Sequence, residues 1–329
     1  MTSTSVSKNG RARRLFRAFL SKNELGAVMP LLIIYFVVLS VNPRFFSINN
    51  IFDILRTASF ALIVAVPCTF LMACGGFDLS IGAVTSFGGV ICAFCLKAGM
   101  PVPAAVIIAL LSGFGVGLIN AVVIVRYDLP PFIATLGVQY AINGIISVST
   151  HANAISGFSA GFKMIGQTRI FGLLSVTVLY TLVIAVAGHI LLVYTKYGRA
   201  MLAIGGNTET AYLSGINVRA KRMSAYIATS VMAALSGVLM ASRFATAQPA
   251  SGSGTELTII AAIIIGGTSM FGGSATIVGS ALGCILLATI TNALIVMGVS
   301  AFWQNFIFGV ILLASIFIDR YRRLASLNG

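Results

Sequence analysis

Long apolar runs, separated by short charged segments, constrain this chain more than any other feature. Most of the runs are about 16–24 residues long, which suits a helix that crosses a bilayer. Inside a bilayer, backbone N–H and C=O groups must be bonded internally, so only helices or closed barrels can span it. The runs lack the strict alternation of barrel strands. The sequence therefore predicts an all-α, polytopic membrane protein.

Composition agrees with this fold class. Of the 329 residues, 58% are hydrophobic and only 9% are charged, whereas a soluble domain carries about 25% charged residues. The apolar runs give ten candidate spans, of which the third, fifth and eighth are short or interrupted. They cover residues 26–41, 59–74, 79–96, 102–125, 132–148, 172–194, 223–242, 257–266, 277–297 and 303–318.

The chain is expected to form one transmembrane domain (26–318) between a basic N-terminal segment (1–25) and a short C-terminal tail (319–329). The first apolar run lacks a small-x-small cleavage site before Arg44, so we expect a retained span rather than a removed signal peptide.

Lysine and arginine set the expected orientation, because cytoplasmic loops are enriched in both. With the N-terminus in the cytoplasm, fifteen of the 21 basic residues lie on the cytoplasmic side. The outer side then holds Arg44, Arg56, Lys97, Lys163, Arg169 and Arg243. An even number of spans also places the basic C-terminal tail in the cytoplasm. The net charge of +14 is thus explained by membrane flanks, and nucleic acid is not an expected partner.

The longest expected cytoplasmic loop, 195–222, contains the signals of a short helix. Asn207 can cap its start, Glu209 lies in its first turn, and Gly215 is a natural stop. The helix would carry a small-residue face of Ala211, Ser214 and Gly215 and a bulkier face of Tyr212 and Ile216. Such a helix could dock in a groove of another protein or pack against the chain's own spans, and the pattern leaves both open.

Two Gly-Gly pairs interrupt the apolar runs. Gly75-Gly76 is followed by Gly82, and Gly266-Gly267 by Gly273, at the same spacing. Paired glycine-interrupted segments can mark a transport site. Because the chain has 34 glycines, a true internal repeat stays an open alternative.

Several motifs resemble those of the ribose-type sugar permease family of ATP-binding-cassette importers, over roughly residues 30–320. The run Glu209-Thr210-Ala211-x-x-x-Gly215 resembles the signature through which importer permeases couple to their ATPase subunits, with Thr210 in place of the usual Ala. The other matching segments are GGFDLSIG (75–82), LPPFIATLG (129–137), GGNTE (205–209), LSGINV (213–218), GGTS (266–269) and GVSAFWQ (298–304). Phe77 and the pair Met270-Phe271 depart from the family pattern.

The resemblance implies the permease subunit of an importer in the bacterial inner membrane. It implies three partners: a cytoplasmic ATPase, a periplasmic sugar-binding protein, and a second permease that is identical or related. It also implies a coupling site that includes Gly206, Asn207, Glu209, Ala211, Gly215 and Ile216. The sugar is left open.

Asp78 directly follows the first Gly-Gly pair. A charge at membrane depth is costly unless it is paired or hydrated. We favour a role as cap and hinge for the next helix over direct substrate contact.

Four amides, Asn120, Gln139, Asn143 and Asn292, lie inside expected spans. Each could bond neighbouring helices together or line a pathway. Gln139, Tyr140 and Asn143 are the best candidates for the pathway, because a sugar needs amide groups with an aromatic face nearby. Gly75, Gly76, Asp78, Gly266 and Gly267 complete the expected pathway and hinge.

Two further motifs have plain structural interpretations. The pairs Gly113/Gly117 and Gly279/Gly283 are G-x-x-x-G motifs that allow close helix packing, either within the chain or between subunits. The pair Cys92 and Cys95 is expected to be two small buried residues rather than a redox or metal site.

The sequence contains no G-x-x-x-x-G-K-[ST] phosphate loop and no H-E-x-x-H motif. His151 and His189 are far apart, so no nucleophile and base can be paired. We therefore expect a transport subunit without catalytic residues, metal or cofactor, with ATP and Mg on the partner ATPase. The alternative is an ion-coupled secondary transporter of a small polar solute, for which only Asp78 and Glu256 come close to being deep ionisable groups.

Overall fold

The computed structural model describes residues 43–300 and, beyond them, residues 303, 306, 307, 309, 310, 313 and 317. The expected first span, 26–41, and the terminal segments 1–25 and 319–329 lie outside the described residues. The expected tenth span, 303–318, lies mostly outside them.

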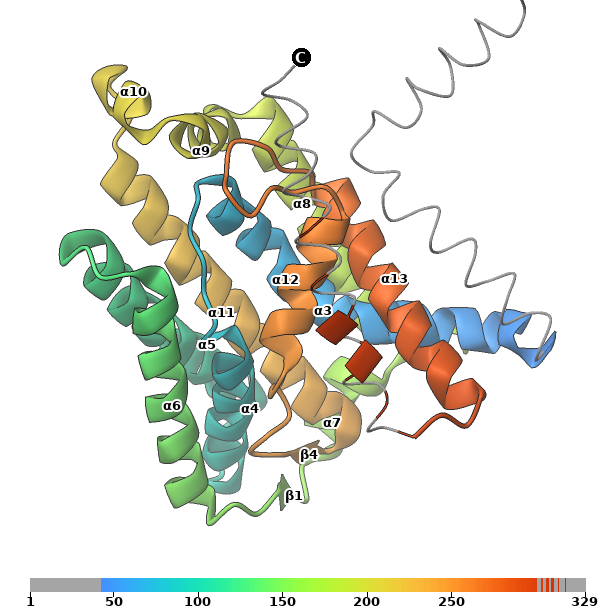
Figure 1. Ribbon diagram of the computed structural model, residues 1–329. Coiled ribbons are helices and arrows are strands. Elements are labelled where there is room, and N and C mark those ends of the chain that lie inside the picture. The colour runs from blue at the N-terminus through green and yellow to red at the C-terminus, as the bar shows by residue number, and fades with distance from the viewer. Residues whose placement is uncertain are drawn as a thin grey trace, which may run out of the picture.

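The described chain is a bundle of helices (Figure 1). Six of them are long and apolar enough to cross a membrane. They are α3 (Ile48–Ala73), α5 (Val102–Ala121) with its π-helical extension η2 (Val122–Arg126), α6 (Pro131–Thr150), α8 (Val176–Tyr194), α11 (Val218–Phe244) and α13 (Ile277–Val296). Two apolar helices are shorter, α4 (Ile81–Lys97) and α12 (Thr255–Ile265). These eight helices overlap the second to ninth expected spans and confirm a helical, polytopic membrane protein.

The remaining elements are short. They are η1 (Pro43–Phe46), α7 (Ala160–Gln167), α9 (Lys196–Gly206), α10 (Thr208–Leu213), the strand pair β1 (Ile155–Ser156) with β4 (Thr246–Ala247), and the pair β2 (Arg169–Ile170) with β3 (Leu174–Ser175). Figure 1 shows α9 and α10 at one end of the bundle and α7, β1 and β4 at the other. We call these the α10 end and the α7 end.

Helix α11 lies at the centre of the bundle and packs against α3, α4 and α5. Close packing depends on small residues. A Cβ atom added at Gly237 would overlap the carbonyl oxygen of Thr85, and one added at Gly88 would lie 2.5 Å from the Cα of Ala234. The backbones of α4 and α11 therefore touch with no side chain between them.

The G-x-x-x-G pairs pack within the chain, which settles one alternative left by the sequence. A Cβ atom at Gly113 or Gly117 would meet α11, at 2.7 Å from Ser230 O and 2.7 Å from Ile227 Cα respectively. Gly279 and Gly283 lie against the carbonyl oxygens at the end of α12. Both motifs are thus intramolecular helix contacts.

Two helices begin earlier than expected. Helix α3 begins at Ile48 rather than at 59. Helix α11 begins at Val218 rather than at 223, because Asn217 caps it by accepting a hydrogen bond from Ala220 N (3.0 Å). Arg219, Lys221 and Arg222 therefore belong to this helix and not to the loop 195–222. Helix α12 has 11 residues, close to the ten that were expected, and at about 16 Å it is roughly half the thickness of a bilayer core.

Basic residues separate between the two ends of the bundle. Arg56 donates a hydrogen bond to Gly166 O of α7 (3.5 Å). Arg243 lies in the last turn of α11, and its backbone carbonyl accepts a hydrogen bond from the Gln167 side chain (3.0 Å). At the other end, Arg222 donates to Thr208 Oγ1 of α10 (3.0 Å). The arginines expected on the outer side and the arginine expected in the cytoplasm therefore lie at opposite ends of the bundle, as the positive-inside pattern predicts.

Candidate functional site

Helix α3 ends at the first Gly-Gly pair. Gly75 has a φ of +76°, a conformation in which glycine is favoured. Gly76 N donates to Leu71 O (2.8 Å), which closes the helix with a Schellman-type turn. Helix α4 starts only at Ile81, so the segment 75–80 is a non-helical break between two apolar helices.

Side chains from neighbouring helices satisfy the backbone of this break. The Tyr226 hydroxyl of α11 accepts from Phe77 N (3.4 Å) and donates to Phe77 O (3.2 Å). Thr135 of α6 accepts from Leu79 N (3.1 Å). Non-helical backbone at membrane depth is tolerated where protein groups bond it, and α6 and α11 supply those groups here.

Asp78 lies inside the break and is 1% exposed. Its carboxylate accepts from Ser80 N (2.8 Å), from Ser80 Oγ (2.6 Å) and from the Asn120 amide of α5 (3.4 Å). Asn120 also donates to Ser80 Oγ (2.8 Å). Because Ser80 is the N-cap of α4, this network fixes the start of that helix and joins it to α5. The geometry suits the cap and hinge that we favour, and the role of Asp78 in transport stays a prediction.

The second Gly-Gly pair ends α12 with the same kind of turn, and Thr268 N donates to Ile263 O (3.2 Å). Here the second glycine, Gly267, takes the positive φ of +94°, whereas in the first pair it is Gly75. The loop that follows returns to the first break, where Gly273 N donates to Ala73 O (3.0 Å). The two breaks therefore lie side by side.

The loop helix expected from the sequence is α10. Asn207 Oδ1 accepts from Thr210 N (2.9 Å), and Glu209 lies in the first turn. Gly215 has a φ of +80°, and Ile216 N donates to Ala211 O (3.1 Å). The predicted cap and stop are confirmed. The sequence did not reveal α9, which precedes α10 in the same loop.

The faces of α10 differ from those expected. Ala211 is buried, although Ser214 and Gly215 of the expected small face are exposed. The exposed apolar pair is Tyr212 and Leu213, at 70% and 78%. The expected faces assumed helical spacing as far as Ile216, but the helix ends at Leu213. Gly206, Asn207 and Glu209 are exposed, and Ile216 is partly buried against the core.

The three candidate pathway residues of α6 have different environments. Gln139 donates to Glu256 Oε1 of α12 (3.2 Å). Tyr140 is 75% exposed, and Asn143 lines an open hollow of about 510 Å³. Glu256 is buried, and its Oε2 has no hydrogen-bond partner among the residues that the structure describes. Of the three, Asn143 lines a hollow at the α7 end, and a role of these residues in transport stays a prediction.

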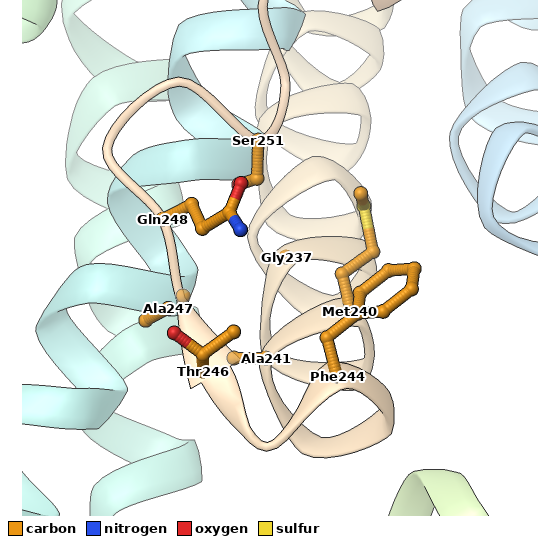
Figure 2. A pocket seen from close by; sticks show the side chains of 9 residues that line it. Gly237, Met240, Ala241, Phe244, Thr246, Ala247, Gln248 and Ser251 are labelled. Atoms are coloured by element: carbon orange, nitrogen blue, oxygen red, sulfur yellow. The ribbon is translucent and has the colours of Figure 1, made fainter. Parts of the chain in front are cut away.

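Gln248 joins two hollows at the α7 end and was not singled out by the sequence. With Ser147, Ser253 and Asn143 it lines the larger hollow. It also lines a hollow of about 240 Å³ against the last turns of α11. Figure 2 shows its amide turned toward Ser251, with Met240 and Phe244 across the hollow. Hydroxyl and amide groups beside apolar side chains suit a small polar solute.

Comparisons with known proteins agree with this architecture. Residues 50–316 match the family described as "Branched-chain amino acid transport system / permease component". The chain is 34% identical to the ribose import permease protein of Bacillus subtilis (strain 168), over 90% of this chain and 92% of that protein. It is 32% identical to the ribose import permease protein of Escherichia coli (strain K12), over 98% and 100%. It is 33% identical to the D-allose transport system permease protein of the same strain, over 96% and 98%. No solved structure matches the chain.

Proposed function

The chain belongs to the family of branched-chain amino acid transport system permease components, and from this membership we propose that it is the membrane-spanning subunit of an ATP-driven sugar importer. It is a multi-pass protein of the bacterial inner membrane. The relatives are named for ribose and D-allose, a pentose and a hexose, so the proposed substrate is a monosaccharide or a related sugar.

The observation that carries the proposal is the exposed face of α10. Tyr212 and Leu213 place two apolar side chains in solvent on a helix that is capped at Asn207 and stopped at Gly215. An exposed apolar pair on a rigid element suits insertion into a groove of a partner protein. We propose that the partner is an ATPase subunit, which holds the ATP and Mg that this chain has no motif to bind.

The proposed topology follows from the partner. If α10 meets the ATPase, the α10 end is cytoplasmic, in agreement with the basic residues there. Ten spans, with both termini in the cytoplasm, remain part of the proposal. The hollows beside Asn143 and Gln248 then open outward, where a periplasmic binding protein would deliver the sugar.

A second permease is the proposed neighbour of α6. Tyr140 and Ser147 are exposed on this helix, and Asn143 is partly exposed. Polar groups are costly in lipid and usually face a protein interior or a water-filled path. A second copy, or a related permease, facing α6 would enclose these groups in a shared pathway.

Co-purification from mild detergent tests the proposal. The tagged chain, expressed from its native locus, should bring an ATPase subunit with it. Leu213→Asp should abolish that association, because a carboxylate cannot be buried in the groove without a large desolvation penalty. Ala203→Asp, which places the same charge at an exposed site on α9, is the matched control. An ATPase-free wild-type preparation, or full retention in Leu213→Asp, would contradict docking through α10.

One observation favours the alternative, an ion-coupled carrier. The carboxylate of Glu256 is buried, and its Oε2 has no hydrogen-bond partner within the described part of the chain; such groups can bind a proton or a cation in carriers. Gradient-driven uptake by this chain alone would support that function.

A further inference from the structure

Arg222 lies between the docking helix and the first break. Its Nη2 donates to Cys74 O (3.4 Å) and to Thr208 Oγ1 (3.0 Å). Cys74 is the last residue before the Gly-Gly pair, and Thr208 is the first residue of α10. One guanidinium therefore bonds the end of α3 to the start of α10.

Tyr226 holds the other side of the same break. It lies four residues after Arg222 on α11, so the two side chains share a helix face. Arg222 binds the carbonyl of Cys74, and Tyr226 binds both backbone groups of Phe77. Helix α11 thus bonds the segment 74–77 at two points, and a shift of α10 relative to α11 would act on that segment.

A second contact reaches both breaks at once. Gly205 is the penultimate residue of α9, three positions before α10. A Cβ atom there would overlap both Ala73 O and Gly273 N. These two atoms form the hydrogen bond between the breaks (3.0 Å). Backbone touches backbone here, so no flexible side chain can absorb a displacement.

Arg222 also keeps a donor free. Its Nε is buried and has no hydrogen-bond partner among the described residues. Buried polar groups are nearly always bonded, and an unbonded donor can be bonded in a second arrangement of the same residues.

We propose that Arg222, supported by the Gly205 contact, is the positioning residue that transmits movement of α10 to both Gly-Gly breaks. This inference rests on the proposed function, because it assumes that α10 is displaced by an ATPase. Arg222 acts through the backbone of residues 73–77 and need not touch the sugar.

The test uses the complete importer, with permease, ATPase and binding protein, in proteoliposomes. The measured quantity is sugar taken up per ATP hydrolysed. In Arg222→Met, we expect this ratio to fall about tenfold, within the range of site-to-site coupling, while the ATPase stays bound and still hydrolyses ATP. Arg222→Lys should recover part of the ratio, because it keeps a charged donor that can reach one acceptor but not both. Arg219→Met, an exposed arginine on the same helix, should retain the wild-type ratio.

Three outcomes would overturn the inference: a wild-type ratio in Arg222→Met, loss of the ATPase from that variant, or a fall in uptake and hydrolysis by the same factor with a lower melting temperature. The last two would make Arg222 a merely structural residue. Failure of the wild-type importer to take up sugar with ATP would instead reject the proposed function and leave the Arg222 contacts unexplained by it.

Two other changes keep the test decisive if Arg222→Met does not accumulate. Thr208→Val removes the hydroxyl that accepts from Arg222, together with the bond that this hydroxyl donates to Ile204 O (2.9 Å), and the ratio should still fall. Gly205→Ala should lower the ratio, whereas Gly115→Ala on α5, where a Cβ atom would have no described neighbour within 4 Å, should not. Wild-type ratios in both Thr208→Val and Gly205→Ala would contradict the proposal.

Discussion

Tyr226 shows how a single side chain can maintain a break in a membrane helix. Its hydroxyl bonds both backbone groups of Phe77, which would otherwise be buried without partners. Tyr226→Phe keeps the ring and removes only these bonds. We expect a loss of about 1–3 kcal/mol in the free energy of unfolding, the cost of leaving buried polar groups unpaired.

Thermal unfolding in detergent measures this effect. Tyr212→Phe is the control, because its hydroxyl is at an exposed site on α10 and its removal should leave the melting temperature unchanged. An unchanged melting temperature in Tyr226→Phe would show that water or another group satisfies Phe77.

At the scale of residues, local chemistry could be predicted and distant contacts could not. The cap at Asn207 and the stop at Gly215 depend on groups within a few positions, so the sequence revealed both. The bond from Gln139 to Glu256 joins residues 117 positions apart, and that from Tyr226 to Phe77 spans 149. Such partners follow from how the helices pack, which apolar periodicity does not determine.

At the scale of elements, helix α5 offers a direct test of the packing argument. Gly113 faces α11, and a Cβ atom there would lie 2.7 Å from Ser230 O. Gly115, on the same helix, has open space at that position. Gly113→Val should destabilise the protein by about 1–3 kcal/mol through overpacking, measured as a lower melting temperature in detergent.

Gly115→Val makes the same change in helix propensity and should be close to neutral. Equal melting temperatures for the two valine variants would contradict intramolecular packing of the Gly113/Gly117 motif. If Gly113→Val lowered the melting temperature of the assembled importer but not that of the isolated chain, the motif would instead lie at a subunit interface.

Hydropathy located the apolar helices well, because it reports the lipid that surrounds them. It failed where other forces set the boundary. Helix α11 extends past the membrane segment because Asn217 caps it, and α9 is not apolar enough to register as a span. Helix α12 was expected at nearly its true length, but only the structure shows that the loop after it bonds to Ala73 through Gly273 N, beside the break at Gly75-Gly76.

At the scale of the whole molecule, the two ends of the bundle should face opposite sides of the membrane. Ser253 is exposed beside the hollow at the α7 end, and Thr208 is exposed at the α10 end. In intact cells, an impermeant thiol reagent should label Ser253→Cys and should label Thr208→Cys only after permeabilisation. The unaltered chain, whose described cysteines are buried or partly buried, gives the background. The reverse labelling pattern would invert the proposed orientation.

The contacts at the α10 end also fit the proposal that a separate chain supplies the free energy for transport. Helix α10, Arg222 and both breaks form one connected path of contacts from the α10 end into the bundle. A separate ATPase chain that displaced α10 would therefore act on both breaks. An ion-coupled mechanism would instead use Glu256, whose Oε2 has no hydrogen-bond partner among the residues with described positions.

The most direct test of the central claim is sugar uptake into proteoliposomes under defined energy sources. An ATP-driven importer should take up sugar only when the ATPase, the binding protein and ATP are all present, with no response to a proton or sodium gradient. Gradient-driven uptake by this chain alone, without ATP, would contradict the account and identify an ion-coupled carrier.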